Sequence, residues 1–282
     1  MTNVGDSTLT GFSSLLSDLT KQGDTFNIEL PHDWLQGRTA YGGLSAALCL
    51  EATIRSFPTL PPLRSAHFSF LGPAVGELSI SSGITRQGKS TAFAQAEVVG
   101  EMGVAAQASF CFGSTRLSEY SFSDLPTPET LPPDDCEPYF SWMNRPNFMQ
   151  HFDGRLVSGA RPCTAGKQPE MLVWLRHKDR AIDSSLVGLL ALADALPPAI
   201  FVMFREPVPI STVTWSVDFL DESFENNDGW WLVRSAAESA RNGFSTQVIS
   251  IWASDGRPVL SARQNVAVFG NATPITRQDV VA

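Results

Sequence analysis

The sequence has few basic residues, few cysteines and no long uninterrupted apolar stretch. Its 282 residues include 20 Lys and Arg against 29 Asp and Glu, which gives a net charge of −9 at pH 7. Nucleic-acid binding depends on clustered basic side chains that neutralise phosphates, so this balance argues against a nucleic-acid partner. Because no apolar stretch reaches the roughly 18 residues of a membrane-spanning helix, we expect no membrane partner either.

Cysteine and histidine are too sparse and too scattered to indicate a metal site. The four cysteines are Cys49, Cys111, Cys136 and Cys163. None belongs to a CxxC pair, and the sequence has neither a GxSxG motif nor a glycine-rich phosphate loop. Residues 1–16 lack the charged head and apolar core of a signal peptide. We therefore expect reduced cysteines, no metal, no cofactor and a cytoplasmic protein.

Two stretches of the sequence, residues 86–113 and 241–270, repeat one pattern. At an offset of 155, the matched pairs are Arg86 with Arg241, Gly88 with Gly243, Ser90 with Ser245 and Thr91 with Thr246. After an inner turn, the offset becomes 157, and Gln107 matches Gln264 while Gly113 matches Gly270. Each copy contains alternating strand-like residues broken by Gly or Asp-Gly turn signals, which predicts a β-hairpin.

The regions upstream of the hairpins also correspond. Extended segments are predicted at 25–31 and 66–74 in the first half and at 170–177 and 215–223 in the second. Within each pair lies a long, nearly continuous apolar stretch, residues 42–56 and residues 183–198, and both are too long for strands. The second stretch begins with a Ser-rich N-cap cluster and ends at two prolines. Each half is therefore predicted to contain a strand, a buried helix and several antiparallel strands.

Four pieces of the sequence carry a resemblance to a known family. They are "GRTAYGG" (37–43), "HFSFLGP" (67–73), "LLALADALPP" (189–198) and "SARQ" (261–264). In this order and spacing, the chain resembles the type II acyl-CoA thioesterases. The resemblance implies an α+β double hotdog, in which two long helices pack on the same side of one extended antiparallel sheet. Residues 1–118 would form the N-terminal hotdog, 119–147 a connecting segment and 148–282 the C-terminal hotdog.

The glycine pair Gly42-Gly43 stands at the start of the first predicted helix. The first N–H groups of a helix have no partner within the helix, and glycine lets a ligand approach the backbone closely. With the family resemblance, this predicts an oxyanion site that polarises the carbonyl of an acyl-CoA or acyl-carrier thioester during attack by water. The alternative is that the glycines only allow the helix to pack closely against a strand.

The resemblance also implies which residues hold the attacking water. Gln264 matches the glutamine of the family, and Ser239 falls near the position of its Ser or Thr. The family aspartate is replaced by Thr212, whose hydroxyl orients water but is no useful base near neutral pH. Asp194 lies alone among apolar residues, so it is either a reserve base or an acid that fixes the helix to neighbouring backbone.

Other candidate residues surround this predicted site. Tyr41 precedes the glycine pair, and His67 lies in the strand beneath the first helix. We expect both to contribute to substrate binding. Coenzyme A phosphates would require basic groups, for which Arg86, Lys89 and Arg241 are the candidates. Each of these residues has a structural alternative, as a hydrogen-bonding histidine or a solvated strand end.

Two classes of function fit these observations. The first is a thioesterase, and the second is a non-hydrolytic hotdog protein that binds acyl groups or acts as a biosynthetic tailoring factor. The second includes dehydratase-like chemistry in which His67 and Asp194 would share one pocket. By resemblance, we also expect the chain to form homo-oligomers.

Overall fold

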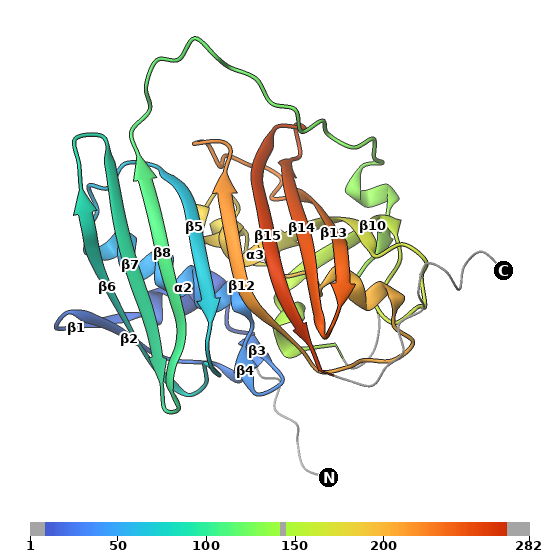
Figure 1. The fold of residues 1–282 in the computed structure, drawn as a ribbon, viewed down its shortest axis with the longest axis horizontal. Coiled ribbons are helices and arrows are strands. Elements are labelled where there is room, and N and C mark those ends of the chain that lie inside the picture. The colour runs from blue at the N-terminus through green and yellow to red at the C-terminus, as the bar shows by residue number, and fades with distance from the viewer. Residues whose placement is uncertain (1–8, 142–144, 270–282) are drawn as a thin grey trace.

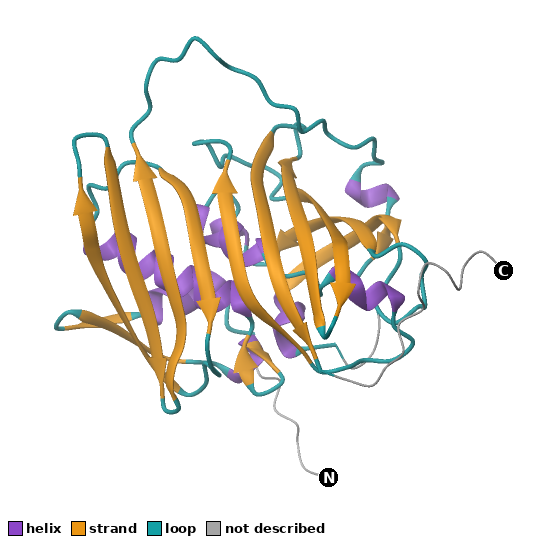
Figure 2. Ribbon diagram, viewed as in Figure 1, coloured by secondary structure: helices purple, strands orange, loops and turns teal. Residues whose placement is uncertain are grey.

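The computed structural model describes residues 9–141 and 145–269, which form one large twisted antiparallel sheet with helices on one face (Figure 1). The sheet has 13 strands in the order β1-β2-β6-β7-β8-β5-β12-β15-β14-β13-β11-β10-β9. Figure 2 shows the helices gathered behind the sheet in this view. Among the described residues, no helix combines the length and apolar character needed to cross a membrane.

The first half of the chain builds one side of the sheet. Its strands are β1 (Thr20–Gln22), β2 (Thr25–Glu29), β5 (Leu63–Phe70), β6 (Glu77–Gln87), β7 (Thr91–Gly100) and β8 (Gly103–Gly113). A small separate hairpin consists of β3 (Leu35–Gln36) and β4 (Thr39–Ala40). The helices of this half are α1 (Phe12–Asp18), the 3-10 helix η1 (His32–Trp34) and α2 (Gly42–Ser56).

The second half builds the other side. Its strands are β9 (Glu137–Pro138), β10 (Phe152–Gly159), β11 (Glu170–His177), β12 (Ile210–Phe219), β13 (Trp231–Arg241), β14 (Phe244–Ala253) and β15 (Pro258–Val268). The α-helix of this half is α3 (Leu186–Ala193). The 3-10 helices are η2 (Pro133–Asp135), η3 (Asn147–His151), η4 (Arg180–Ile182) and η5 (Ala199–Met203).

The strand order is symmetric about the junction between β5 and β12. The order β2-β6-β7-β8-β5 on one side mirrors β11-β13-β14-β15-β12 on the other. The two predicted hairpins, β7–β8 and β14–β15, occupy equivalent places. At the junction, Phe68 pairs with Trp215, and both rings are fully buried with their centroids 5.4 Å apart. The two halves therefore share one continuous sheet and one core.

The two central helices differ in length. Helix α2 has 15 residues and is buried over most of its surface, as the sequence predicts. Helix α3 has only eight residues and ends at Asp194, although the apolar stretch continues to Pro198. Proline lacks an N–H and disfavours helical conformation in the residue before it, so Pro197-Pro198 terminate the helix early. The segment after Asp194 becomes a turn followed by η5.

Two peripheral segments close the core. Helix α1 lies next to the loop before α3, where Ser13 donates a hydrogen bond to Asp179, and its Phe12 ring packs on His177 with centroids 5.3 Å apart. The connection between the halves covers part of the outer sheet face, where Trp174 and Trp252 donate hydrogen bonds to its backbone. Comparable tryptophans are missing from the described strands of the first half.

Candidate active site

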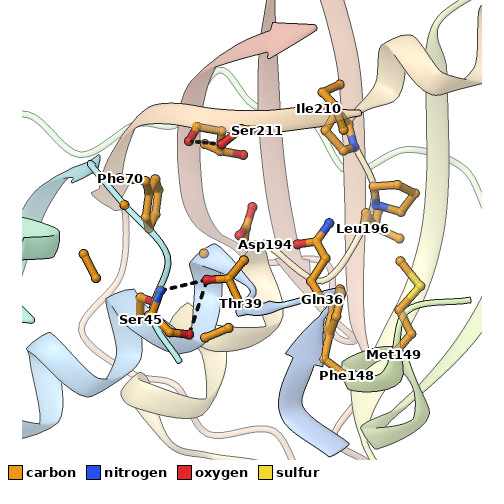
Figure 3. Close-up of a pocket in the computed structure, with 18 residues that line it drawn as sticks. Gln36, Thr39, Ser45, Phe70, Phe148, Met149, Asp194, Leu196, Ile210 and Ser211 are labelled. Atoms are coloured by element: carbon orange, nitrogen blue, oxygen red, sulfur yellow. Dashed lines mark hydrogen bonds between the residues drawn. The ribbon is translucent and has the colours of Figure 1, made fainter. Parts of the chain in front are cut away.

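A cavity of about 180 Å³ lies at the start of α2, where the two halves meet. Figure 3 shows its walls, with Asp194 near the centre of the view. The lining residues come from α2 (Gly42, Ser45), the β3–β4 hairpin (Gln36, Thr39), β5 (Phe70) and η3 (Phe148, Met149). The wall also includes Asp194 and Leu196 after α3 and Ile210, Ser211 and Thr212 in β12. The cavity thus combines backbone from a helix start with one acidic side chain.

Asp194 is the acidic group in this wall. It is the C-cap residue of α3, deep within the protein, and keeps a part of its surface accessible from the cavity. Burial raises the pKa of its carboxyl from 3.8 to about 7, because a buried charge loses hydration. Hydrogen bonds from the Gln264 side chain and the Gly43 backbone oppose this shift by stabilising the ionised form. The carboxyl is therefore poised to exchange a proton near neutral pH.

The glycine pair has two different roles in the geometry. A Cβ atom on Gly43 would lie 2.5 Å from the Ala191 carbonyl oxygen, so this glycine is required for the close crossing of α2 and α3. A Cβ atom on Gly42 would lie 2.7 Å from Oδ2 of Asp194 and 3.0 Å from the Phe70 ring. Gly43 thus allows the close packing that the alternative interpretation predicts, and Gly42 leaves space in the cavity next to the acid, while the oxyanion role stays a prediction.

The first two N–H groups of α2 differ in their hydrogen bonding. The N–H of Gly43 hydrogen-bonds to Asp194. Gly42 lines the cavity, and within the described part of the chain no acceptor is found for its N–H. The helix start thus holds the carboxylate with one N–H and leaves another for a bound group.

Gln264 connects Asp194 to a second glutamine. Its Nε2 donates to Oδ1 of Asp194 over 2.5 Å, and its Oε1 accepts from Nε2 of Gln247. Oε1 of Gln247 in turn accepts from the backbone N–H of Ala199 over 2.8 Å. Both glutamine side chains are buried and lie opposite each other on β14 and β15. Gln264 was predicted from the sequence and Gln247 was not, although a Gln at an inward position of an apolar alternating strand is a visible signal.

Thr212 and Ser239 lie in different surroundings. Thr212 lines the cavity beside Ser211, at an irregularity in the pairing of β12 with β15. Ser239 is exposed near the end of β13 and does not line this cavity. The structure thus brings Thr212 together with Asp194 and does not bring Ser239 to them.

His67 lies on the opposite face of the sheet from the cavity. Its ring is exposed, and Nδ1 is 2.8 Å from Oγ of Ser216 on the neighbouring strand. The adjacent Phe68 points into the core instead, as strand alternation requires. The structure therefore does not place His67 and Asp194 in one pocket.

Tyr41 supports the cavity from behind. Its ring is buried and stacks on Phe148 with centroids 4.1 Å apart, and its hydroxyl donates to the Ala191 carbonyl over 3.2 Å. Burial, with a contribution from Asp194, raises the pKa of Tyr41 well above its ordinary value, so the phenol stays neutral. Tyr41 thus positions a wall residue and the end of α3.

The three basic candidates for phosphate binding are not equally placed. Strand β6 begins at the cavity end of the sheet and runs away from it. Arg86 and Lys89 therefore lie at its far end, about 30 Å from the start of the strand. Arg241 ends β13 beside the turn that contacts Val268, at the same sheet end as Ile210. Arg38, which the sequence analysis did not consider, is exposed at the tip of the β3–β4 hairpin, between two cavity-lining residues.

Metal ligation finds no support in the described ranges. Among residues 9–141 and 145–269, there is no group of three or more His, Cys, Asp or Glu placed to hold a metal ion. The polar lining instead consists of one carboxyl, amide and hydroxyl groups, and backbone. These groups are suited to move a proton and to orient water or a carbonyl group.

Comparison with protein-family models assigns both halves. Residues 30–113 match the acyl-CoA thioesterase N-terminal domain, and residues 128–268 match the acyl-CoA thioesterase C-terminal domain. The chain belongs to the acyl-CoA thioesterase family. In this acyl-CoA thioesterase chain, the start of α2 comes from the N-terminal domain, whereas Asp194, Thr212 and Gln264 come from the C-terminal domain. The cavity is therefore built by both domains.

Solved structures confirm the hotdog architecture. A conserved protein of unknown function with a hotdog fold from Alicyclobacillus acidocaldarius is 23% identical, with a TM-score of 0.82 over 91% of this chain and 98% of that one. A candidate thioesterase II from Thermobifida fusca is 17% identical, with a TM-score of 0.77 over 93% and 98% of the two chains. An acyl-CoA thioesterase II from Mycobacterium marinum is 19% identical, with a TM-score of 0.71 over 90% and 96%. A comparison with curated protein sequences gives no match.

Proposed function

We propose that this protein hydrolyses the thioester of an acyl-CoA or acyl-carrier substrate, with Asp194 as general base. One observation carries the proposal: a carboxyl whose pKa is raised to about 7 lines a cavity at the start of α2. A base is most effective when its pKa lies near the working pH. The family assignment supports a thioester as the substrate class.

In the proposed reaction, water attacks the carbonyl carbon while Asp194 accepts one of its protons. The developing negative charge on the carbonyl oxygen is stabilised by the N–H of Gly42 and by the dipole of α2. Collapse of this intermediate breaks the carbon–sulfur bond, and protonated Asp194 returns the proton to the leaving thiolate. The products are a carboxylic acid and a free thiol, and the enzyme returns to its starting state.

The remaining polar groups position the reactants. Gln264 holds the carboxylate through its Nε2, and the hydroxyl of Thr212, which also lines the cavity, orients the water. Thr212 stands where the family resemblance implies an aspartate, and in this proposal Asp194 after α3 supplies the acid instead. Ser239 has no role in this proposal, because it does not line the cavity.

Arg38 and Arg241 are the basic groups that we propose for the phosphates of coenzyme A. Both are exposed at the cavity end of the sheet, and neither forms an ion pair with another described residue. A phosphate group there gains charge-assisted hydrogen bonds from the guanidinium groups. We assign no such role to Arg86 and Lys89, which lie at the far end of β6.

We also propose that residues 1–118 and 148–282 are the two hotdog units and that copies of the chain associate. The division follows the internal symmetry of the strand order. Association is expected from the family resemblance. Light scattering at high protein concentration tests it, and a strict monomer of 30.6 kDa contradicts it.

A second candidate function is acyl binding without hydrolysis. Thr212 in place of an aspartate favours it, because a hydroxyl cannot deprotonate water at neutral pH. Under this alternative, Asp194 is a structural acid that joins Gly43 and Gln264. Dehydratase-like chemistry with His67 receives no support, because His67 lies on the other face of the sheet.

The deciding experiment measures free thiol release from a panel of acyl-CoA thioesters of increasing chain length. Wild type is expected to release thiol, and Asp194→Asn to lower kcat by about 100-fold or more. Glu51→Gln is the matched control, because Glu51 is an acid on α2 paired with Arg55 outside the cavity. Binding of acyl-CoA by wild type without thiol release establishes the second candidate, and full activity in Asp194→Asn removes Asp194 as the base.

A further inference from the structure

A second buried glutamine lies behind the proposed active site. Gln247 on β14 pairs directly across the strands with Gln264 on β15, and each side chain is only 1% exposed. Burying an amide is costly unless both its oxygen and its nitrogen find partners. Here each glutamine uses both ends of its amide in one continuous chain of hydrogen bonds.

The direction of this chain is set at its far end. The backbone N–H of Ala199 can only donate, so it must meet Oε1 of Gln247. Gln247 therefore presents its Nε2 to Oε1 of Gln264. Gln264 is left with its Nε2 toward Oδ1 of Asp194. A backbone donor thus determines, through two amides, that an N–H rather than an oxygen faces the carboxyl.

We propose that Gln247 is a positioning residue that fixes the amide orientation of Gln264 and so favours the ionised, proton-accepting form of Asp194. The proposal rests on the proposed hydrolytic function, in which that form removes a proton from water. Without Gln247, no partner on the far side of the Gln264 amide distinguishes its oxygen from its nitrogen, and only the charge of Asp194 itself favours the N–H. In the reversed orientation, an oxygen faces Asp194, and the carboxyl must keep a proton to form a hydrogen bond.

The same contacts hold the segment that carries the acid. Asp194 and Ala199 stand at the two ends of a short turn that contains Pro197 and Pro198. Gln264 hydrogen-bonds to one end of the turn and Gln247 to the other, so the β14–β15 hairpin holds the turn at two points. Gln247 therefore affects both the position of Asp194 and the orientation of the Gln264 amide, and the experiment must separate these two effects.

The surroundings of Asp194 contain few other charges. The packed elements present Gly42 and Gly43 from α2, Phe70 from β5, Thr212 from β12 and Phe148 from η3. Among the described residues, Tyr41 is the titratable group with a resolved electrostatic interaction with Asp194, and it stays neutral. A change in the titration of Asp194 after substitution of Gln247 thus reports on the hydrogen-bond chain.

The experiment compares the titration of Asp194 in wild type and in Gln247→Met. Carbon-13 NMR of labelled aspartate carboxyls gives the midpoint without substrate, and the pH profile of kcat gives it during turnover. We expect the midpoint to rise by about one pH unit in Gln247→Met, because the oriented donor is lost. At pH 7, kcat then falls about fivefold and recovers by about pH 9, with KM unchanged. Ser245→Ala is the control, since Ser245 is buried on the same strand face outside the chain of hydrogen bonds.

The direction in which the Asp194 midpoint shifts shows whether Gln247 orients the Gln264 amide or only holds the turn in place. If Gln247 only holds the turn, its loss hydrates Asp194, and the midpoint falls toward the ordinary value of an aspartate. An unchanged or lowered midpoint overturns the proposal. Where Gln247→Met does not fold, Ala199→Pro takes its place: it removes the N–H that sets the direction, at the first position of a 3-10 helix where proline is tolerated. A midpoint raised in this variant supports the proposal, and a midpoint that stays or falls overturns it.

Failure of this inference is distinguishable from failure of the proposed function. If wild type releases no thiol from any acyl-CoA, the hydrolytic function is wrong, while the NMR titration still tests the hydrogen-bond chain. If wild type is active and the midpoint in Gln247→Met does not rise, the hydrolytic function stands and only the role of Gln247 is wrong.

Discussion

The two central helices begin in opposite surroundings, although they occupy equivalent places in the repeated halves. Helix α2 starts without a side-chain cap, and its first turn borders the cavity. Helix α3 starts at Ser185, whose side chain accepts the N–H of Gly188. Helix α1 lies against the loop before α3. One helix start thus faces a cavity, whereas the other is closed by its own side chain and a covering helix.

A buried titratable group with a shifted pKa lies near each helix, Asp194 beside α2 and His177 beside α3, and burial shifts these two in opposite directions. The pKa of Asp194 beside α2 is raised to about 7, whereas the pKa of His177, which donates to the Gly188 carbonyl in α3, is lowered to about 4. Burial disfavours the charged form of each. Asp194 is thereby tuned to exchange protons near neutral pH, and His177 is kept neutral. Under the proposed function, the carboxyl beside α2 exchanges a proton, whereas the imidazole at α3 makes a structural contact.

The largest expected effect concerns the cost of keeping Asp194 buried. Its folded-state pKa of about 7 lies above the ordinary 3.8, so the folded protein holds a proton that the unfolded chain releases. The free energy of unfolding should therefore fall as pH rises from about 4 to 7, by up to about 4 kcal/mol. Asp194→Asn should abolish this component. Urea unfolding of both proteins at pH 4.5 and pH 8 measures it, and parallel pH dependences would contradict it.

The next largest effect concerns the stability lost when Gly43 in α2 or Gly188 in α3 is replaced by alanine. In Gly43→Ala, the new methyl group meets the Ala191 carbonyl at 2.5 Å, so α2 and α3 must separate. We expect a loss of about 3 kcal/mol in the free energy of unfolding. In Gly188→Ala, the new methyl group meets the flexible Cδ1 of Ile182 at 2.9 Å and the Ile182 carbonyl oxygen at 3.0 Å, a looser backbone contact, and we expect a loss of about 1 kcal/mol. Thermal and urea unfolding compare the two, and equal losses would show that the helix crossing is not the tighter contact.

A third prediction concerns His177. Its folded-state pKa of about 4 lies below the ordinary 6.5, so the unfolded chain binds a proton that the folded protein excludes. This contribution to stability is complete above pH 6.5 and is lost as pH falls toward 4, by up to about 3 kcal/mol. His177→Gln should flatten the acid side of the stability curve. Unfolding measured between pH 7 and pH 4.5 gives the slope, and a slope equal to that of wild type would rule out His177 as its source.

Much of the fold could be predicted from the sequence, because the same turn residues and the same alternation of apolar and polar residues recur in both halves. The matched hairpins predicted the β14–β15 and β7–β8 pairs, and the apolar stretches predicted α2 and α3. The length of α3 was overestimated, because apolarity continues through Asp194 to the prolines while the helix does not. A continuous apolar stretch predicts burial, but it does not show how much of the buried segment is helical. The end of the helix is indicated only by the prolines, which disfavour helical backbone.

The site was readable only in parts. Asp194 and Gln264 each stood out as polar residues within apolar stretches, yet their contact joins residues 70 positions apart. Which end of a strand meets the helix start is a property of the folded sheet, and for this reason Arg86 was considered and Arg38 was not. Gln247 could have been found by asking which residue must satisfy the second end of a buried Gln264 amide.

The smallest expected effect concerns the cap of α3. Ser185 accepts the N–H of Gly188 over 3.2 Å, and such a cap typically contributes about 1 kcal/mol to the free energy of unfolding. Ser185→Ala should lower stability by this amount and leave thiol release unchanged, because the start of α3 does not line the cavity. Urea unfolding and kcat with the preferred acyl-CoA measure the two effects side by side. A fall in kcat beyond about twofold in the folded variant would show that the two helix starts are coupled, and the division between a proton-exchanging start and a structural start would then have to be abandoned.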